Sequence, residues 1–591
     1  MRRWAPAVLL VCALLGLGLL LDVGTARPAE AHATVTTTTP ADGARLDSAP
    51  AEVTIGFNES VSIGAGYARV LDADGDRVDT GDPSVRDGVL TVPLRNDLPD
   101  ASYVVTYRVV SADSHPVSGA FSFVVGDGAL VPAGSVGGDD AIDPGLGVAL
   151  PLARWLGYLG IALGVGLPVA LAWSWPGGWA LPLLRRLAVG GLVAVAVSGV
   201  LLLLLQGAYA AGAGLGSAVD PQLIGTTIDS GYGRTLLARI VLAGLLAGVL
   251  LLGRPSRAVL AVGGLLGGGL VLATAAVGHP VAGSLRGLAV AVSAVHVAAM
   301  SIWLGGLVAL LAGALRPAAA AVDLGPTLLR WSRLAAGCVG ALVVTGVLQS
   351  VREVGSFSGL VDTRYGWVLL AKLAVVAVVL VAALVSRDWV QQRVGTSHRP
   401  SRRVVVQAFA DTDAEAGTHA EADAGTHAEA GIATQRSAGQ PGIGVLRRSV
   451  LVEVVGAVVV LVVSAVLVSQ VPATASVAAP VEVTLPLQSA SGTAGTGTVQ
   501  VFLEPAAPGP TTLHVHLFDA EGRLTQPQQI TVALTEEQQQ IGPLDVDLSP
   551  AGPGQYVGDP VLPAAGTWTL TVTVRLDEFT AVTASTTFPV R

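Results

Sequence analysis

The sequence predicts a multidomain membrane protein in which an eight-helix transmembrane bundle lies between two exported domains. The 591 residues are 51% hydrophobic and 13% charged, and the mean hydropathy is +0.63, which is too apolar for a soluble chain of this length. Eight apolar stretches have about the 20 residues that a helix needs to cross a bilayer. A segment with strand-like alternation follows them. The net charge of −9 argues against nucleic acid as a partner.

Residues 1–31 have the pattern of a secretory signal peptide. Two arginines precede an apolar run, and Ala29-Glu30-Ala31 has the small-x-small form of a signal peptidase site. Cleavage there leaves His32 at the mature amino terminus, where its α-amino group and its imidazole Nδ1 can chelate one metal ion. We therefore predict that His32 is a metal ligand. The alternative is a histidine that only happens to follow a cleavage site.

A carboxylate and an imidazole occur two residues apart in the same exported domain. They are Asp113 and His115, and on an extended strand such a pair leaves the same face. Together with His32 they supply three nitrogens and one oxygen. This donor set suits tetragonal Cu(II) better than zinc or a hard cation.

This domain resembles a known family. The residues that carry the resemblance are His32-Ala33, Pro40-Ala41-Asp42-Gly43, Phe57, Tyr107 to Asp113 and His115-Pro116. Over residues 32–126 the chain is similar to the periplasmic copper-binding protein CopC. The resemblance implies a Greek-key β-sandwich that holds Cu(II) through His32, Asp113 and His115. The family usually has Trp-Arg at Tyr107-Arg108 and glycine at Ser114, but neither difference removes a ligand.

The membrane region is predicted over residues 148–471, after a linker at 127–147. We place its helices at 148–173, 187–207, 235–253, 258–278, 287–312, 331–351, 367–386 and 449–471. Export of the first domain puts the amino terminus outside, and eight crossings return the chain there. Most arginines flanking the helices then fall at cytoplasmic ends, as the positive-inside rule requires. The predicted location is therefore the cytoplasmic membrane, with both terminal domains extracytoplasmic.

The helical region resembles CopD, a membrane partner often joined to CopC in one chain. The residues that carry the resemblance are Arg154 to Gly160, His296, Trp303 to Leu307, Tyr365 to Lys372 and Leu446 to Glu453. A CopD-like unit fused to a CopC-like domain implies a protein that handles copper.

Polar and sulfur-bearing side chains within the predicted helices are candidates for a metal pathway. His296 lies about nine residues into its helix, near the bilayer midplane. Met300 is one turn deeper, and Cys338 in the next helix is predicted at about the same depth. An imidazole, a thioether and a thiolate suit Cu(I). The alternative is that His296 bonds a neighbouring helix while Met300 and Cys338 fill space.

Three further residues are weaker candidates in or near the bundle. His279, at the outer end of the fourth helix, would relay metal from the exported domain, unless it is a solvated loop histidine. Lys372 is the single lysine among the 34 basic residues, and Glu453 lies near the inner end of the eighth helix. We predict that Lys372 and Glu453 differ too much in depth to pair.

The two remaining regions are a polar loop and a β domain. In the cytoplasmic loop at 387–446, Gly417 to Ala422 recurs as Gly425 to Ala430, and we interpret the loop as a disordered, low-complexity insertion. Within residues 476–591 we predict four half-buried strands from their alternation, at Val499 to Leu503, Thr512 to Leu517, Gln529 to Leu534 and Thr567 to Val574. The corner from Ala564 to Trp568 resembles YtkA-like domains, and the region is therefore predicted to be a C-terminal β-sandwich. His514 and His516 share a strand face there, as a second copper site or as a solvated face.

The preferred function is capture of Cu(II) outside the cell and its import across the membrane, with copper and the lipid bilayer as partners and other copper chaperones as further candidates. No ATPase P-loop occurs in the sequence. The first alternative is copper resistance by sequestration or export. The second is a copper-dependent redox enzyme, which we disfavour because no aromatic substrate platform is evident. The two cysteines, Cys12 in the signal and Cys338, exclude a disulfide within the mature chain.

Overall fold

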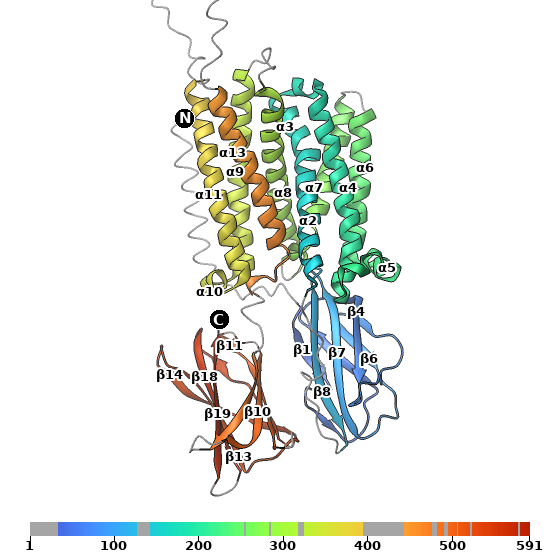
Figure 1. Ribbon diagram of the computed structural model, residues 1–591, viewed down its shortest axis with the longest axis vertical. Helices are drawn as coiled ribbons and strands as arrows, with labels where there is room; N and C mark the ends of the chain where they lie inside the picture. The colour runs from blue at the N-terminus through green and yellow to red at the C-terminus, as the bar shows by residue number, and fades with distance from the viewer. Residues whose placement is uncertain are drawn as a thin grey trace, which may run out of the picture.

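The computed structural model describes three bodies: a β-sandwich, a helical bundle and a second β domain (Figure 1). The described residues are 33–126, 142–252, 256–282, 285–316, 324–393, 443–474, 481–489, 494–504, 506, 508–520, 523–552, 554–576 and 580–590. Both β domains lie at the same end of the bundle (Figure 1). We call this end the domain-side face and the opposite end the far face.

The N-terminal domain is a sandwich of two four-stranded sheets, as predicted. One sheet has the order β1-β3-β6-β5 and the other β2-β8-β7-β4. The strands are β1 (Val35–Thr39), β2 (Arg45–Leu46), β3 (Glu52–Phe57), β4 (Val61–Leu71), β5 (Ser84–Arg86), β6 (Val89–Pro93), β7 (Ala101–Ser111) and β8 (Pro116–Val125). Alternate residues of both sheets, such as Ile55, Leu90 and Phe123, are fully buried between them. This burial of one face per strand stabilises the sandwich.

The eight predicted membrane helices are confirmed among the described residues, each apolar enough to cross a bilayer. Two of them contain a short π-helical stretch, Ala162–Gly166 (η2) and Leu310–Ala314 (η6). The spans are α2 to α3 (Pro144–Ser174), α4 (Pro182–Ala211), α6 (Gly231–Leu252), α7 (Arg257–Ala275), α8 with η6 (Arg286–Ala314), α9 (Leu324–Val354), α11 (Arg364–Arg393) and α13 (Ile443–Leu467). Short helices α5 (Pro221–Asp229) and α10 (Phe357–Val361) lie at the domain-side face (Figure 1).

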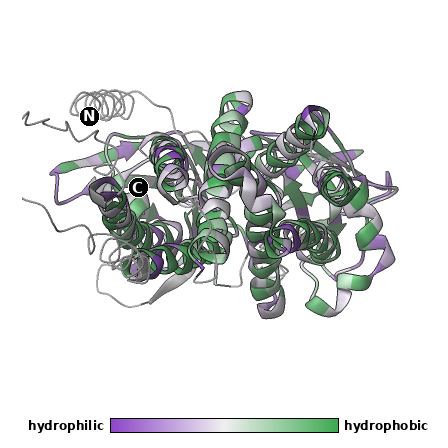
Figure 2. Ribbon diagram, turned by 90° about the horizontal axis from the view of Figure 1, so that it is seen from above, coloured by the Kyte–Doolittle hydropathy of each residue, from purple (hydrophilic) through white to green (hydrophobic). Residues whose placement is uncertain are grey.

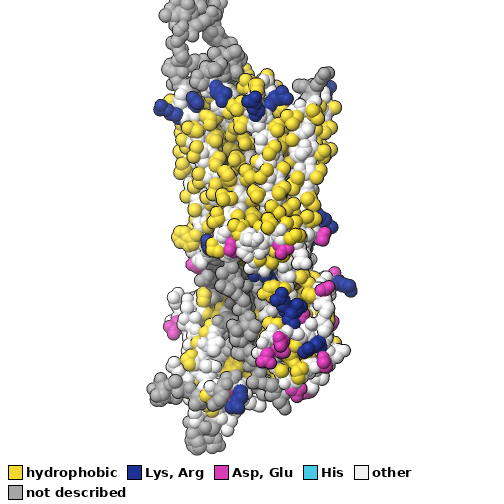
Figure 3. Space-filling model, turned by 45° about the vertical axis from the view of Figure 1, so that its right-hand side comes forward, with side chains coloured by type: hydrophobic (Ala, Val, Ile, Leu, Met, Phe, Trp, Pro, Cys, Tyr) yellow, Lys and Arg dark blue, Asp and Glu magenta, His cyan; other side chains and the backbone are white. Residues whose placement is uncertain are grey.

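The surface of the bundle matches a bilayer. A continuous hydrophobic band covers the side of the bundle that Figure 3 shows, with basic side chains gathered at the far face. Seen along the bundle, hydrophobic residues predominate on the helices (Figure 2). The basic residues at the far ends of the described helices are Arg185, Arg186, Arg257, Arg316, Arg330, Arg333, Arg387, Arg447 and Arg448.

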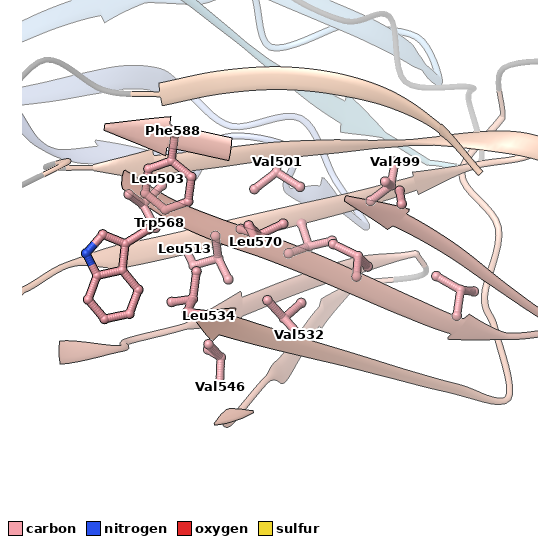
Figure 4. Packing of buried hydrophobic residues seen from close by; sticks show 14 of the residues in the cluster. Val499, Val501, Leu503, Leu513, Val532, Leu534, Val546, Trp568, Leu570 and Phe588 are labelled. Atoms are coloured by element: carbon pink, nitrogen blue, oxygen red, sulfur yellow. The ribbon is translucent and has the colours of Figure 1, made fainter. Parts of the chain in front are cut away.

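The C-terminal domain is built from one curved nine-stranded sheet of order β14-β13-β18-β19-β9-β10-β12-β16-β15. Side chains from its two halves meet in one core, with Val501 and Leu513 from one half and Leu534 and Trp568 from the other (Figure 4). The strands are β9 (Val481–Ser489), β10 (Ala494–Glu504), β12 (Thr512–Phe518), β13 (Gln529–Glu536), β14 (Ile541–Val546), β15 (Ser549–Gly552), β16 (Gln555–Gly558), β18 (Gly566–Arg575) and β19 (Ala581–Val590), with β11 (Gly509–Pro510) and β17 (Val561–Leu562) as a separate pair. The four strands predicted here are confirmed.

The two β domains contact each other through a small patch. Val124 of β8 packs against Phe518 of β12. Nearby, Gly43 has a positive φ of 74°, and a Cβ at this position would lie 2.9 Å from Nε2 of His516. A glycine is therefore required both by the backbone conformation and by the close approach of the second domain.

Candidate metal centre

The connection between β7 and β8 carries the two metal-ligand candidates of the sandwich. β7 ends at Ser111 and β8 begins at Pro116, so Asp113 and His115 lie in a tight turn. The prediction that they share a face of an extended strand is wrong. Ser114 adopts a positive φ of 75°, and this reverses the chain between them. Their side chains still meet, with His115 Nδ1 at 3.1 Å from Asp113 Oδ1.

Local hydrogen bonds fix the carboxylate of Asp113. Its Oδ1 accepts the backbone N–H of His115 at 3.1 Å and the hydroxyl of Ser111. Asp113 is 2% exposed and His115 is 4% exposed. Because a buried carboxylate is costly without such partners, the turn is organised around this side chain.

Arg108 holds the turn against the membrane bundle. Its Nε donates to the carbonyl of Ala210 at 2.8 Å and its Nη2 to the carbonyl of Tyr209 at 3.4 Å. These carbonyls belong to the last turn of α4, where the negative end of the helix dipole favours a cation. Gln206 of the same helix donates to the carbonyl of Ser114 at 2.8 Å. The sandwich is therefore docked on α4 by Arg108 of β7 and by the β7–β8 turn.

Docking brings His279 of the bundle to the sandwich. His279 begins the short helix η5 (His279–Val281) that follows α7, and it is 6% exposed. Its ring stacks on that of His115 with centroids 5.3 Å apart and planes at 26°. The sequence predicted His279 as a relay at the outer end of the fourth membrane helix, and the structure places it beside Asp113 and His115, the ligand candidates of the sandwich.

Asp113, His115 and His279 form one cluster. Each offers a ligand atom, and these atoms lie within 4.8 Å of one another. Ligands at about 2 Å from a common ion lie up to about 4 Å apart, so the cluster needs only a small contraction to bind one. Within the described part of the chain, this is the one group of three or more His, Cys, Asp or Glu side chains that meets this criterion.

Glu353 of α9 supports His279 from the other side. Its Oε2 lies 3.3 Å from His279 Nδ1, and it is 7% exposed. Arg352 adds a hydrogen bond to the carbonyl of His279 at 3.4 Å. A carboxylate on one ring nitrogen directs the other nitrogen to a metal. Glu353 was missed in the sequence, although a carboxylate at the end of an apolar helix was a usable signal.

The other predicted ligands are distributed as follows. His32 lies outside the described residues, which begin at Ala33, a buried residue of the sandwich core. In the bundle, His296 Nδ1 lies 2.8 Å from the hydroxyl of Thr345 on α9. Cys338 is seven residues before Thr345, about 10 Å along the helix axis, whereas Met300 is only one turn from His296. The pathway through His296, Met300 and Cys338 stays a prediction.

Lys372 and Glu453 are far apart, as predicted. Lys372 is near enough to His296 for the two to interact electrostatically. Glu453 instead accepts a hydrogen bond of 2.5 Å from Ser386, which is fourteen residues after Lys372 on α11 and so about 21 Å away along the axis. Any role of the two in moving metal or protons stays a prediction.

His514 and His516 lie on β12 near the contact between the β domains. Burial lowers the pKa of His514, while Asp42 and Asp559 oppose this shift. Burial also lowers the pKa of His516, again opposed by Asp42. Among the described residues, the group with metal-binding geometry is Asp113, His115 and His279, and it does not include this pair. The role of His514 and His516 as a second copper site stays a prediction.

Comparisons with known proteins cover both the sandwich and the bundle. The CopC domain model matches residues 35–126, the copper resistance protein D-like N-terminal domain matches 142–288, and copper resistance protein D matches 325–417. The chain is 31% identical over 368 residues to the copper transport protein CutJ of Bacillus subtilis (strain 168). That alignment covers 59% of this chain and 66% of CutJ, so the chain spans about two thirds of this relative.

Two further matches concern the sandwich alone. Protein YobA of Escherichia coli (strain K12) is 33% identical over 99 residues, which are 16% of this chain and 79% of YobA. The crystal structure of CopC from Methylosinus trichosporium OB3b is 27% identical, covers 16% of this chain and 95% of that chain, and has a TM-score of 0.15. The order of the matched domains along the chain is the order of its structural bodies. The chain therefore carries a CopC domain and the domains of copper resistance protein D in one polypeptide, and it is similar to proteins that handle copper.

Proposed function

We propose that the protein captures Cu(II) at its CopC domain and passes copper through the helical bundle into the cell. The observation that carries the proposal is the cluster of Asp113 and His115 from the sandwich with His279 from the bundle. A site shared by a receptor domain and a membrane domain allows one ion to change ligands without entering solvent. The name of the relative CutJ, a copper transport protein, supports the same function.

The proposed ligands act in two groups. His32, with its free amine, joins Asp113 and His115 to hold Cu(II) on the sandwich, since nitrogen and carboxylate donors suit this ion. His279 then takes the ion toward the bundle, and Glu353 keeps its ring in position. His296 lies further along the bundle, where an imidazole inside a membrane is a candidate for a transport pathway.

The proposed orientation places the far face in the cytoplasm. The arginines gathered there support it (Figure 3), because positive side chains are retained on the cytoplasmic side of short loops. The domain-side face and both β domains are then extracytoplasmic. Inward transport is preferred because the proposed capture site is at the face from which copper arrives.

The test is total cell copper measured by mass spectrometry under copper limitation and under copper excess. Cells lacking the protein are compared with cells that carry the intact chain, His32→Ala, His279→Ala or the control Glu52→Gln, which changes an exposed carboxylate of β3. We expect less copper without the protein under limitation, with recovery only for the intact and control chains.

The opposite outcome would support copper resistance. If cells without the protein hold more copper, or grow worse in excess copper, the inward direction is wrong. If His279→Ala restores cell copper as well as the intact chain does, the shared site is not on the transport route. Membrane levels of each variant, measured by immunoblot, separate loss of function from loss of protein.

A further inference from the structure

A small cavity lies between the sandwich and the bundle, next to the candidate metal centre. Its volume is about 40 Å³, which is more than the 10–15 Å³ or so that one water needs by the same measure. Asp113 and His115 line it from the sandwich, and α2, α4, α6 and the end of α7 line it from the bundle. The metal cluster therefore has a space beside it, lined in part by polar side chains, that the proposed transport function does not explain.

Two arginines line this cavity. Arg239 of α6 is 5% exposed, and its Nε has no hydrogen-bond partner. Within the described part of the chain, no carboxylate forms an ion pair with it. Arg154 of α2 also lines the cavity and hydrogen-bonds the hydroxyl of Ser469. A buried cation without a counter-charge is costly, and in a membrane helix it indicates a functional site.

The absence of a side chain at Gly157 on α2 leaves space for the guanidinium of Arg239. A Cβ at Gly157 on α2 would lie 3.1 Å from Nη2 of Arg239 and 2.6 Å from the hydroxyl of Ser198. That hydroxyl is already used, since it donates to the carbonyl of Ala153 at 2.6 Å. The neighbouring helices therefore accommodate the charge without neutralising it.

The charged groups around the cavity favour an anion over a cation. Two arginines line it, and the one carboxylate in the lining, Asp113, already accepts the hydroxyl of Ser111 and the backbone N–H of His115. A guanidinium has five N–H donors and no acceptor, and Tyr158 and Tyr232 line the same space. A cation would be repelled by both arginines. The small volume favours a monatomic anion over a carboxylate metabolite or a phosphate ester.

We propose that Arg239 and Arg154 bind a small monovalent anion, such as chloride, beside the metal centre. The anion neutralises the buried arginines in the absence of metal. Because Asp113 and His115 line the same cavity, it also reduces the repulsion between the arginines and a copper ion held by these residues. Anion and copper then bind with positive coupling, and the coupling is reciprocal.

The first test measures chloride binding to the full-length, metal-free protein in nanodiscs, through the broadening of the chloride NMR resonance. We compare the intact chain with Arg239→Gln and with the control Arg234→Gln, an exposed arginine near the start of the same helix. We expect broadening that bromide competes away in the intact and control chains, and its loss in Arg239→Gln. Absence of broadening in the intact chain, or the same broadening in Arg239→Gln, overturns the proposal.

A second variant guards against misfolding. Arg239→Lys keeps the charge, so it is expected to retain chloride binding while Arg239→Gln does not. Melting temperatures in chloride and in gluconate at equal ionic strength give an independent readout. Chloride should stabilise the intact chain and Arg239→Lys but leave Arg239→Gln unchanged. Equal stabilisation of all three would mean a nonspecific salt effect and would overturn the site.

The coupling is tested by copper affinity, and this arm rests on the proposed metal centre. Chloride in place of gluconate should tighten copper binding by about 5-fold or more in the intact chain and should have no effect in Arg239→Gln. If chloride binds but copper affinity does not change, the anion site stands and its coupling to the metal is refuted. If copper does not bind at all, the proposed function fails while the chloride result still decides the anion site.

Discussion

Two places in this molecule bring histidines close to another domain, and they differ in what the other domain supplies. At the β7–β8 turn, Asp113 and His115 meet His279 of the bundle within 4.8 Å. On β12, His514 and His516 face the region of Asp42 and Gly43, but no third ligand of comparable geometry is found in the described residues. Sequence spacing alone makes the two pairs look equivalent. The difference shows that a third ligand from a separate segment distinguishes a metal centre from a pair of histidines.

The sharpest test of this comparison removes one histidine from each place. His115→Ala should weaken Cu(II) binding by more than about 100-fold, because losing a ligand exceeds the 10–100-fold effect of losing a partner of a ligand. His516→Ala should leave the affinity within about threefold. Competition with a chromophoric chelator on the full-length protein measures both values. Similar losses in the two variants would break the distinction.

A smaller effect is expected from the carboxylate behind His279. Glu353→Gln keeps the size and shape of the side chain but removes its charge, so its interaction with His279 Nδ1 is weaker. Copper affinity should therefore fall by about 10-fold. The control is Glu453→Gln, which changes another buried carboxylate near the far face of the bundle and should have no effect on affinity. Nitrogen hyperfine couplings in the Cu(II) electron paramagnetic resonance spectrum should change in Glu353→Gln alone. An unchanged spectrum and affinity would mean that His279 does not contact the ion.

The smallest expected effect is a pH dependence at the contact between the β domains. Burial holds the pKa of His514 and of His516 below the ordinary value of 6.5, against the opposing charges of Asp42 and Asp559. A lowered histidine pKa means that protonation favours the exposed state. The contact is therefore intact above about pH 6.5 and weakens as the pH falls through and below that value.

Hydrogen exchange of the β12 amides at pH 7.5 and pH 5.5 measures this contact. Protection should fall at the lower pH in the intact chain and stay constant when both histidines are replaced by glutamine. If the replaced chain shows the same loss, other groups cause it and the histidines only fill the interface.

Much of the architecture followed from patterns that are local in the sequence. The apolar stretches predicted the eight helices because each needs only enough apolar residues to span the bilayer. Strand alternation predicted β12, β13 and β18 in the same way. The prediction of an extended strand through Asp113 and His115 was wrong, because these residues lie in a tight turn. Nothing in the residue types requires the positive φ of Ser114, which a non-glycine residue adopts only when the surroundings impose it.

The composition of the candidate site was only partly predictable. Asp113, His115 and His279 were each identified, but their meeting depends on how the sandwich docks on α4. Arg239 was not singled out, because its place in an apolar helix gives no information on the cavity beside it. Glu353 was also missed, although a carboxylate at the end of an apolar helix indicates a buried partner, because its contact with His279 is made between separate segments. Contacts between segments far apart in the chain are set by tertiary packing and have no local sequence pattern.

The hydrogen bonds from Arg108 to the end of α4 bear on the rate of the proposed transfer of a metal ion from the sandwich to the bundle. A receptor on a free tether must find its membrane partner by diffusion, and its effective concentration depends on the length of the tether. Here the sandwich is already docked on the bundle in the folded molecule, so no diffusional search is needed. The proposed transfer of copper from His115 to His279 should then be a first-order step whose rate does not depend on how many copies of the protein the membrane contains.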